Sequence, residues 1–182
     1  MRLALCICPQ WSVQTPSFAI GSLKSHINNK DVVVEQIDLN ILSSIYTKEK
    51  NIEKFWDWGN DTPWNSETNF QTEILPYFKD LWHEYIEILS TYDIVAFTTY
   101  TSNIITTDYI ARYVKQINPK IQIWYGGPYS WYSECGGLVE KDNYREFVDI
   151  ACGSNDGERI ISDLVNKYIE DGHYENIRGI YR

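Results

Sequence analysis

Residues Ile121-Gln122-Ile123-Trp124-Tyr125-Gly126-Gly127-Pro128 form an apolar run that ends in two glycines and a proline. The run is typical of a buried strand, and glycines at its end allow a ligand to approach the backbone closely. In open α/β sheets, ligands bind at the carboxyl ends of the strands. The stretch therefore predicts a central strand and, directly after it, one wall of a binding site.

Two other apolar runs end in polar loops. Asp93-Ile94-Val95-Ala96-Phe97 precedes Thr98-Thr99-Tyr100-Thr101-Ser102-Asn103, and Val148-Asp149-Ile150-Ala151-Cys152 precedes Gly153-Ser154-Asn155-Asp156-Gly157-Glu158. The hydroxyl and amide side chains of these loops are compact, uncharged donors and acceptors. Because the carboxyl ends of parallel strands meet at one edge, we expect all three loops to border one crevice.

Strand-like and helical patterns alternate along the chain. Strands are expected at residues 3–8, 32–37, 94–97, 121–125 and 148–151, and the helices between them show apolar stripes. The stripes are Phe18, Leu23 and Ile27; Ile105, Tyr109, Tyr113 and Ile117; and Ile160, Ile161, Leu164, Val165, Tyr168 and Ile169. This succession predicts an α/β fold over residues 1–182: a flavodoxin-like (Rossmann-like) five-stranded parallel sheet of order 2-1-3-4-5.

An insertion at about residues 41–90 lies between the second and third strands and is rich in aromatic residues. It contains Phe55, Trp56, Trp58 and Trp64, followed by a helix expected at residues 73–90 with the stripe Ile74, Phe78, Leu81, Tyr85 and Leu89. Two interpretations are open. The aromatic segment packs on its own domain, or it forms a docking surface or a cover over the crevice, because clustered exposed aromatic residues mark contact sites.

Composition excludes several classes of protein. The chain has 182 residues, a net charge of −9 and 43% hydrophobic residues. Binding to nucleic acid requires clustered Lys and Arg, and the sequence has no basic run. It also has no apolar run of about 20 residues, and its first expected strand begins almost at Met1. We therefore expect a cytoplasmic protein that binds neither nucleic acid nor membrane.

The cysteines are not spaced as metal ligands. Cys6 and Cys8 are two residues apart on an expected strand and face the same side, and Cys135 and Cys152 stand alone. The sequence lacks CxxC and CxxxCxxC, so we expect small core residues, no metal site and no cluster on this chain. The phosphate loop GxxxxGK[ST] and the dinucleotide fingerprint GxGxxG are also absent, and no catalytic residues can be assigned.

Five segments, in this order, resemble one family. They are Cys8-Pro9-Gln10-Trp11 with residues 15–23, Gln36-Ile37-Asp38-Leu39-Asn40, residues 93–103, residues 118–128, and residues 153–158. Over essentially the whole chain, they are similar to the N-terminal cobalamin-binding domain of cobalamin-dependent radical S-adenosylmethionine enzymes. The resemblance implies a corrinoid across the carboxyl ends of the strands, with its nucleotide tail beside the third-strand and Gly-Gly loops. The implied cofactor-binding residues are Pro9, Gln10, Trp11, Thr98, Thr99, Tyr100, Thr101, Ser102, Asn103, Gly126, Gly127, Pro128, Gly153 and Ser154.

The chain departs from related patterns in two places. The family's last loop reads Gly-Glu-Gly-Glu, whereas residues 153–158 are two residues longer and lack the first Glu. Classical cobalamin domains carry D-x-H-x-x-G after the first strand, and here residues 9–14 hold no histidine. The resemblance thus implies a base-off, His-off corrinoid, with Trp11 or Gln10 nearest the cobalt. A weakly ligated cobalt suits methyl transfer or related radical chemistry.

The resemblance covers only the binding domain. It implies that residues 176–182 are an exit segment toward a catalytic barrel in the same polypeptide, where the iron–sulfur cluster and S-adenosylmethionine would bind. Two alternatives stay open: a corrinoid-free interaction or positioning domain of the same fold, and a flavodoxin-like binder of another ligand.

Overall fold

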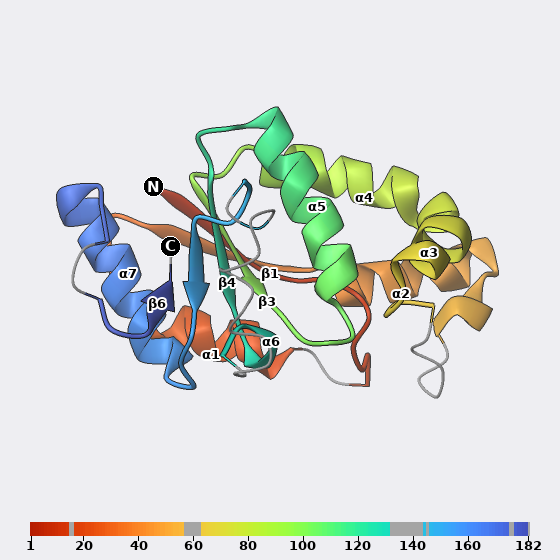
Figure 1. The fold of residues 1–182 in the computed structure, drawn as a ribbon, viewed down its shortest axis with the longest axis horizontal. Coiled ribbons are helices and arrows are strands. Elements are labelled where there is room, and N and C mark those ends of the chain that lie inside the picture. Colours follow the sequence, from red (N-terminus) through yellow and green to blue (C-terminus); the bar gives the residue numbers. More distant parts are fainter. Residues whose placement is uncertain (15–16, 57–62, 132–143, 145, 175–176, 182) are drawn as a thin grey trace.

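The computed structural model describes residues 1–14, 17–56, 63–131, 144, 146–174 and 177–181. In these residues the chain forms an α/β fold around one mostly parallel sheet of six strands, an arrangement of the Rossmann-like type (Figure 1). The strand order is β2-β1-β3-β4-β5-β6. The strands are β1 (Arg2–Ile7), β2 (Val33–Asp38), β3 (Ile94–Thr98), β4 (Gln122–Gly126), β5 (Ile150–Cys152) and β6 (Ile180–Tyr181).

The parallel part of the sheet confirms the expected order 2-1-3-4-5. Ile7 lies opposite Asp38 on one side and Thr98 on the other, and Thr98 lies opposite Gly126, so these strands end in line. The expectation of five strands is wrong. Residues 180–181 add β6 antiparallel to β5, and the Gly153 amide donates to the Gly179 carbonyl at 2.7 Å.

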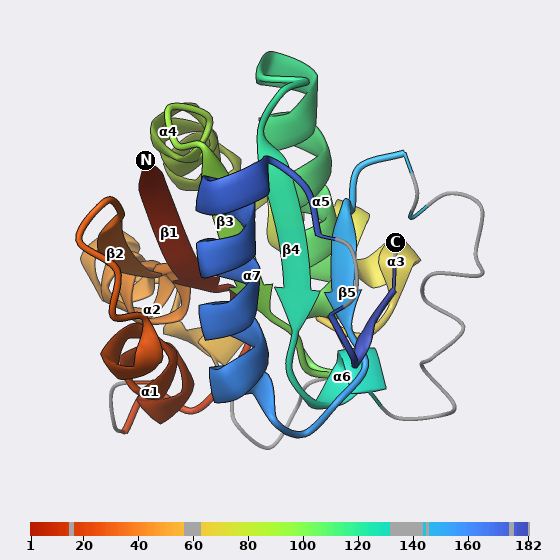
Figure 2. The ribbon, with the colours of Figure 1, turned by 90° about the vertical axis from the view of Figure 1, so that its left-hand side faces the viewer.

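Helices cover both faces of the sheet (Figure 2). One face carries α1 (Phe18–His26) and α7 (Gly157–Asp171), and the other carries α2 (Leu39–Lys50), α4 (Leu75–Leu89) and α5 (Ile104–Ile117). The shorter segments are η1 (Glu53–Trp56), α3 (Glu67–Asn69), the π-helical η2 (Phe70–Ile74) and α6 (Pro128–Trp131). No helix in the described ranges is long and apolar enough to cross a bilayer.

The alternation of side chains along each strand separates two cores. Leu5, Ala96 and Trp124 belong to the core under α1 and α7. Cys6 and Cys8 belong to the core under α2, α4 and α5, where both are fully buried and free, as expected for small core residues. Cys152 is also buried, and Cys135 lies outside the described residues.

Two helical stripes differ from their expected orientation. Phe18, the first residue of α1, is 86% exposed, and Ile20 takes the buried position beside the partly buried Leu23 and Ile27. In α5 the buried side chains include Ile110 and Val114, whereas Ile117 is exposed. A four-residue step overshoots one helical turn by about 40°, so a stripe of such steps drifts away from the core.

Within the aromatic insertion, Trp56 and Trp64 pack against α4. Trp64 is buried with its ring centroid 5.6 Å from that of Phe78 and 5.5 Å from that of Trp56, and Phe78 stacks on Trp82 at 5.1 Å. The Trp82 indole donates to the Ser43 hydroxyl at 3.0 Å, which ties α4 to α2. For Trp56 and Trp64 this supports packing on their own domain. Trp58 and the Phe55 side chain lie outside the described part of the structure.

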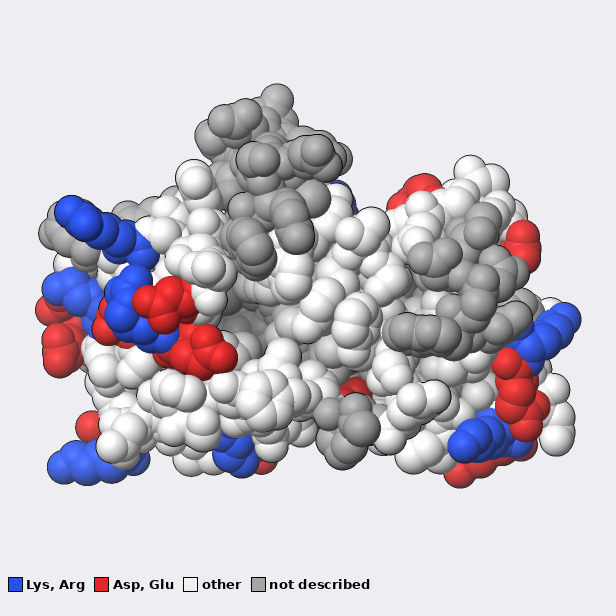
Figure 3. All heavy atoms as spheres, turned by 90° about the horizontal axis from the view of Figure 1, so that it is seen from below, with Lys and Arg blue, Asp and Glu red and all other residues white. Residues whose placement is uncertain are grey.

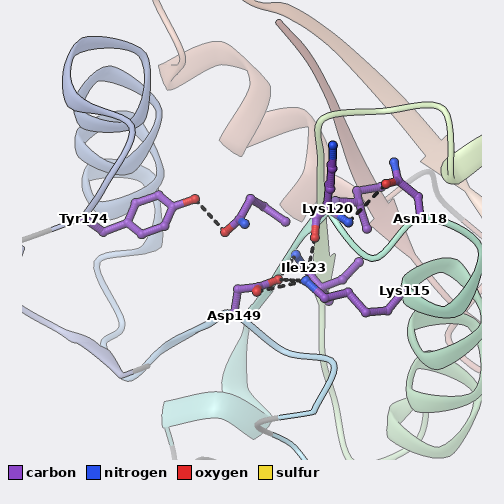
Figure 4. Close-up of polar contacts among 8 residues, drawn as sticks. Lys115, Asn118, Lys120, Ile123, Asp149 and Tyr174 are labelled. Atoms are coloured by element: carbon purple, nitrogen blue, oxygen red, sulfur yellow. Dashed lines mark hydrogen bonds and ion pairs between the residues drawn. The ribbon is translucent and has the colours of Figure 1, made fainter.

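A polar cluster holds the amino ends of β4 and β5 together (Figure 4). The Lys115 ammonium lies 2.8 and 2.9 Å from the Asp149 carboxylate oxygens and donates to the Ile121 carbonyl at 2.7 Å. The same carboxylate accepts from the Ile123 amide at 2.8 Å, and the Tyr174 hydroxyl donates to the Gln122 side chain at 2.8 Å. Because β5 has only three residues, these contacts fix its position beside β4.

Candidate functional site

A cavity of about 210 Å³ lies at the carboxyl ends of β3, β4 and β5, on the face covered by α1 and α7. The strands contribute Ala96, Trp124 and Ile150 to its lining, and the two helices contribute apolar side chains that include Leu23 and Leu164. Loop residues border it at the strand ends. The position agrees with the general location of ligand sites in open α/β sheets.

Six of the expected cofactor-binding residues line this cavity: Thr98, Tyr100, Gly126, Gly127, Pro128 and Ser154. They come from the last residues of β3 and β4 and from the segments that follow β3, β4 and β5, which the sequence predicted to meet. The other eight lie elsewhere: Pro9, Gln10, Trp11, Thr99, Thr101, Ser102, Asn103 and Gly153. The cavity therefore involves the third, fourth and fifth strands and not the loop after the first.

The loops after β1 and β3 are tied to each other. The Asn103 side-chain amide donates to the carbonyls of Cys8, at 3.3 Å, and Thr98, at 3.1 Å. The Ser102 hydroxyl donates to the Gln10 carbonyl at 2.8 Å. Trp11 stacks on Tyr100 with ring centroids 4.3 Å apart. These polar groups hold the edge of the sheet in shape, and an apolar aromatic pair lies at the point where the strand order reverses.

The two glycines at the end of β4 have different roles. Gly127 has a φ of 100°, and a Cβ there would lie 2.7 Å from the Thr99 carbonyl oxygen and 2.9 Å from its nitrogen. The space that a Cβ would occupy at Gly127 is thus filled by the backbone of Thr99. A ligand therefore cannot use that space to approach the main chain. Gly126 differs, because a Cβ there would lie 3.8 Å from that of Cys152, at an ordinary contact distance.

The segment after β5 lines the cavity and leads into α7, which is bonded to α1. A Cβ on Gly153 would collide with the Tyr181 ring, so this glycine accommodates β6. Ser154 and Asn155 line the cavity, as does Glu158 in the first turn of α7. The Glu158 carboxylate accepts from the Ser22 hydroxyl of α1 at 3.0 Å. Glu158 therefore links the two helices that form the cavity wall.

Charged side chains are sparse on the face at the strand ends. Figure 3 shows this side of the molecule, from below the view of Figure 1. The visible Lys, Arg, Asp and Glu side chains gather at its two ends, and the described part of its centre is almost entirely uncharged. For a chain with a net charge of −9, this distribution favours a neutral ligand at the centre of the face.

A partly buried carboxylate lies on the opposite face of the sheet. Asp108 of α5 accepts hydrogen bonds from the hydroxyls of Tyr125, at 3.0 Å, and Tyr144, at 2.8 Å. Burial raises the pKa of Asp108 to about 6, although both tyrosine hydroxyls lower it. Asp108 is not among the residues that line the cavity, and no sequence motif singled it out.

We expect Asp108 to make the fold more stable as the pH falls from 7 to 5. The folded carboxyl takes up its proton near pH 6, whereas the unfolded one does so near its ordinary pKa of 3.8, so the folded state binds more protons between these values. The gain is about 1 kcal/mol by pH 5. Urea unfolding at pH 7, 6 and 5 measures it, with Asp108→Asn as the control that lacks this titration. The same pH dependence in both proteins would contradict the assignment.

Sequence reasoning missed the apolar lining and Trp124. Trp124 is 3% exposed, and its indole nitrogen has no hydrogen-bond partner among the described residues. The signal was its position: a side chain with a polar N–H in the middle of an otherwise apolar strand needs an acceptor. No group of three His, Cys, Asp or Glu side chains in the described ranges could hold a metal ion.

In comparisons with known proteins, no family model and no curated sequence matched this chain.

Proposed function

We propose that this chain binds a corrinoid of the cobalamin class at the carboxyl edge of its sheet, as the cofactor-binding domain of a radical S-adenosylmethionine enzyme. The observation that carries the proposal is the cavity under the ends of β3, β4 and β5, in a sheet whose parallel strands have the flavodoxin-like order 2-1-3-4-5. The resemblance of the loop sequences to cobalamin domains supports the same ligand.

The size of the cavity suits one end of the ligand. Pockets that enclose a whole small molecule measure about 300–1,000 Å³, and this one measures about 210 Å³. It can therefore take the base of the nucleotide tail, while the much larger corrin ring lies outside on the uncharged face. Amide groups on the rim of a corrin ring need hydrogen bonds more than charges, which agrees with the sparse charge there.

The histidines support a base-off, His-off mode of binding. His26 is the last residue of α1, His173 follows α7, and His83 lies within α4, where it contacts the Tyr109 hydroxyl at 2.9 Å. Helices that start at the carboxyl edge end at the opposite edge, so His26 and His173 are distant from the strand ends. The lower face of the cobalt would then meet the loop of Gln10 and Trp11.

A bound corrinoid supplies methyl transfer or related radical chemistry through its cobalt. In this proposal the chain's own residues bind and orient the ligand. The iron–sulfur cluster and the S-adenosylmethionine site belong to a catalytic barrel of the same polypeptide. The proposal therefore has three parts: a corrinoid ligand, a catalytic barrel in the same polypeptide, and a location in the cytoplasm.

The test is reconstitution of the purified chain with hydroxocobalamin or methylcobalamin. We expect about one equivalent to remain after gel filtration, with the absorbance spectrum of the base-off form at neutral pH. A base-on spectrum would contradict the placement of the tail in the cavity. A colourless protein would contradict corrinoid binding and favour a positioning domain or another ligand of a flavodoxin-like fold.

A further inference from the structure

Four aromatic rings that can be oxidised form a continuous path from the insertion to the surface of α5. The ring centroids of Trp64 and Trp82 are 6.4 Å apart, and those of Trp82 and Tyr109 are 6.1 Å apart. Tyr109 continues to Tyr113 at 4.8 Å. Trp64 and Trp82 are buried, whereas Tyr113 is 38% exposed. These distances are those of rings in direct contact, so this aromatic path joins the buried insertion to solvent.

The residue types on the aromatic path suit one-electron chemistry. Tryptophan and tyrosine lose one electron more readily than phenylalanine does. Electron transfer between side chains slows steeply as their separation grows, so rings in contact exchange an electron much faster than rings one layer apart. An electron vacancy made on Trp64 therefore moves along the path to the tyrosines.

Tyr109 has an acceptor for the proton that its oxidation releases. An oxidised phenol is a very strong acid, so a tyrosine keeps the vacancy only if its proton leaves with the electron. The Tyr109 oxygen lies 2.9 Å from Nε2 of His83, and this nitrogen accepts the hydroxyl proton when the neutral imidazole is protonated on Nδ1. Burial raises the pKa of Tyr109 to about 12, so the phenol keeps its proton until an electron is removed.

Two neighbouring aromatic residues lack this arrangement. The Trp82 indole donates to the Ser43 hydroxyl at 3.0 Å, and a hydroxyl is a much weaker base than an imidazole. A vacancy on Trp82 is therefore not held there and passes to Tyr109. Tyr46 packs against the same core, but the Lys50 ammonium lies 5.4 Å from its ring centroid and opposes the loss of an electron.

We propose that the aromatic path carries oxidising equivalents out of the insertion to the surface at Tyr113, and so protects the core from one-electron oxidants. The oxidant, an oxygen-derived radical or an oxidised metal complex, takes one electron from Trp64. The vacancy moves through Trp82 to Tyr109, whose proton passes to His83. An electron from Tyr113 then restores Tyr109, which takes its proton back, while the Tyr113 proton goes to water. A thiol in solution returns an electron to Tyr113, which regains a proton from water, so the net reaction moves one electron from the thiol to the oxidant and releases the thiol proton. This activity is separate from corrinoid binding.

The experiment delivers the oxidant beside Trp64. Asn65 is exposed, so Asn65→Cys can carry a ruthenium polypyridyl label, and Cys135→Ser in the same chain leaves native cysteines that are all buried. A laser flash with an external quencher then generates ruthenium(III) at this position. We expect the transient absorbance of a tryptophan radical to give way to that of a tyrosyl radical, more slowly in deuterium oxide. Tyr109→Phe should abolish the tyrosyl signal and prolong the tryptophan signal.

Three further variants test the parts of the aromatic path. His83→Gln keeps a hydrogen-bond acceptor but removes the base, so it should also suppress the tyrosyl signal. Tyr113→Phe should let the radical form on Tyr109 and slow its reduction by an added thiol. Tyr46→Phe is the matched control and should behave as the parent. A tyrosyl signal of parental size in Tyr109→Phe, an equal loss in Tyr46→Phe, or a tryptophan radical that decays in the parent without a tyrosyl signal would overturn the inference. None of these results bears on corrinoid binding.

Discussion

Trp82→Ala is expected to lower the free energy of unfolding by about 3–5 kcal/mol, a large part of the stability of a domain of this size. Trp82 is fully buried at the centre of the aromatic insertion. Its ring stacks on Phe78, and its indole donates to Ser43. The substitution removes both contacts and leaves a cavity that backbone relaxation fills only in part.

Guanidinium unfolding followed by far-ultraviolet circular dichroism measures this loss. Ile88→Ala in the same helix is the matched control, because Ile88 is 39% exposed and its truncation should cost less than about 1 kcal/mol. A loss below about 1 kcal/mol for Trp82→Ala would show that the insertion adds little to the stability of the domain.

Ala96→Phe is expected to weaken cobalamin binding by at least about 100-fold while the domain stays folded. Ala96 lies on β3 and lines the cavity, so the added ring would occupy the space proposed for the base of the nucleotide tail. Overpacking a filled core costs about 1–3 kcal/mol, but here the existing cavity of about 210 Å³ accommodates the ring.

Absorbance titration with cobalamin and a thermal unfolding curve test the two halves of this prediction. Ala96→Ser is the control, since it changes polarity at the same position with almost no change in volume. If Ala96→Phe binds cobalamin as tightly as the parent chain, the nucleotide tail lies outside this cavity.

The parallel strands were predictable because each is an apolar run bounded by Gly, Pro or polar turn residues, and their observed ends differ from the expected ones by a residue or two. β6 was not recognisable as part of the sheet. Two residues show no periodicity. Their pairing depends on the backbone contact between Gly153 and Gly179, and these two glycines are separated in the sequence by the whole of α7. Local patterns carry no information about such contacts.

The candidate site was predictable only in its loops. A polar residue at a strand end can face a ligand or its own backbone, and the sequence does not distinguish the two. Thr98 lines the cavity, whereas Asn103 is fully buried and bonded to main-chain carbonyls. The apolar residues of α1 and α7 that line the cavity have the same sequence pattern as core residues. A cavity forms where packed side chains leave space unfilled, and the sequence pattern does not show where this happens.

The β2 edge of the sheet limits self-association by strand addition through charge. An exposed edge strand offers unpaired backbone groups to a strand of another molecule. β2 has six residues, but Glu35 near its middle is ion-paired with Arg2, so an incoming strand would meet this charge pair. Growth into larger β-assemblies is therefore opposed by charge at this edge.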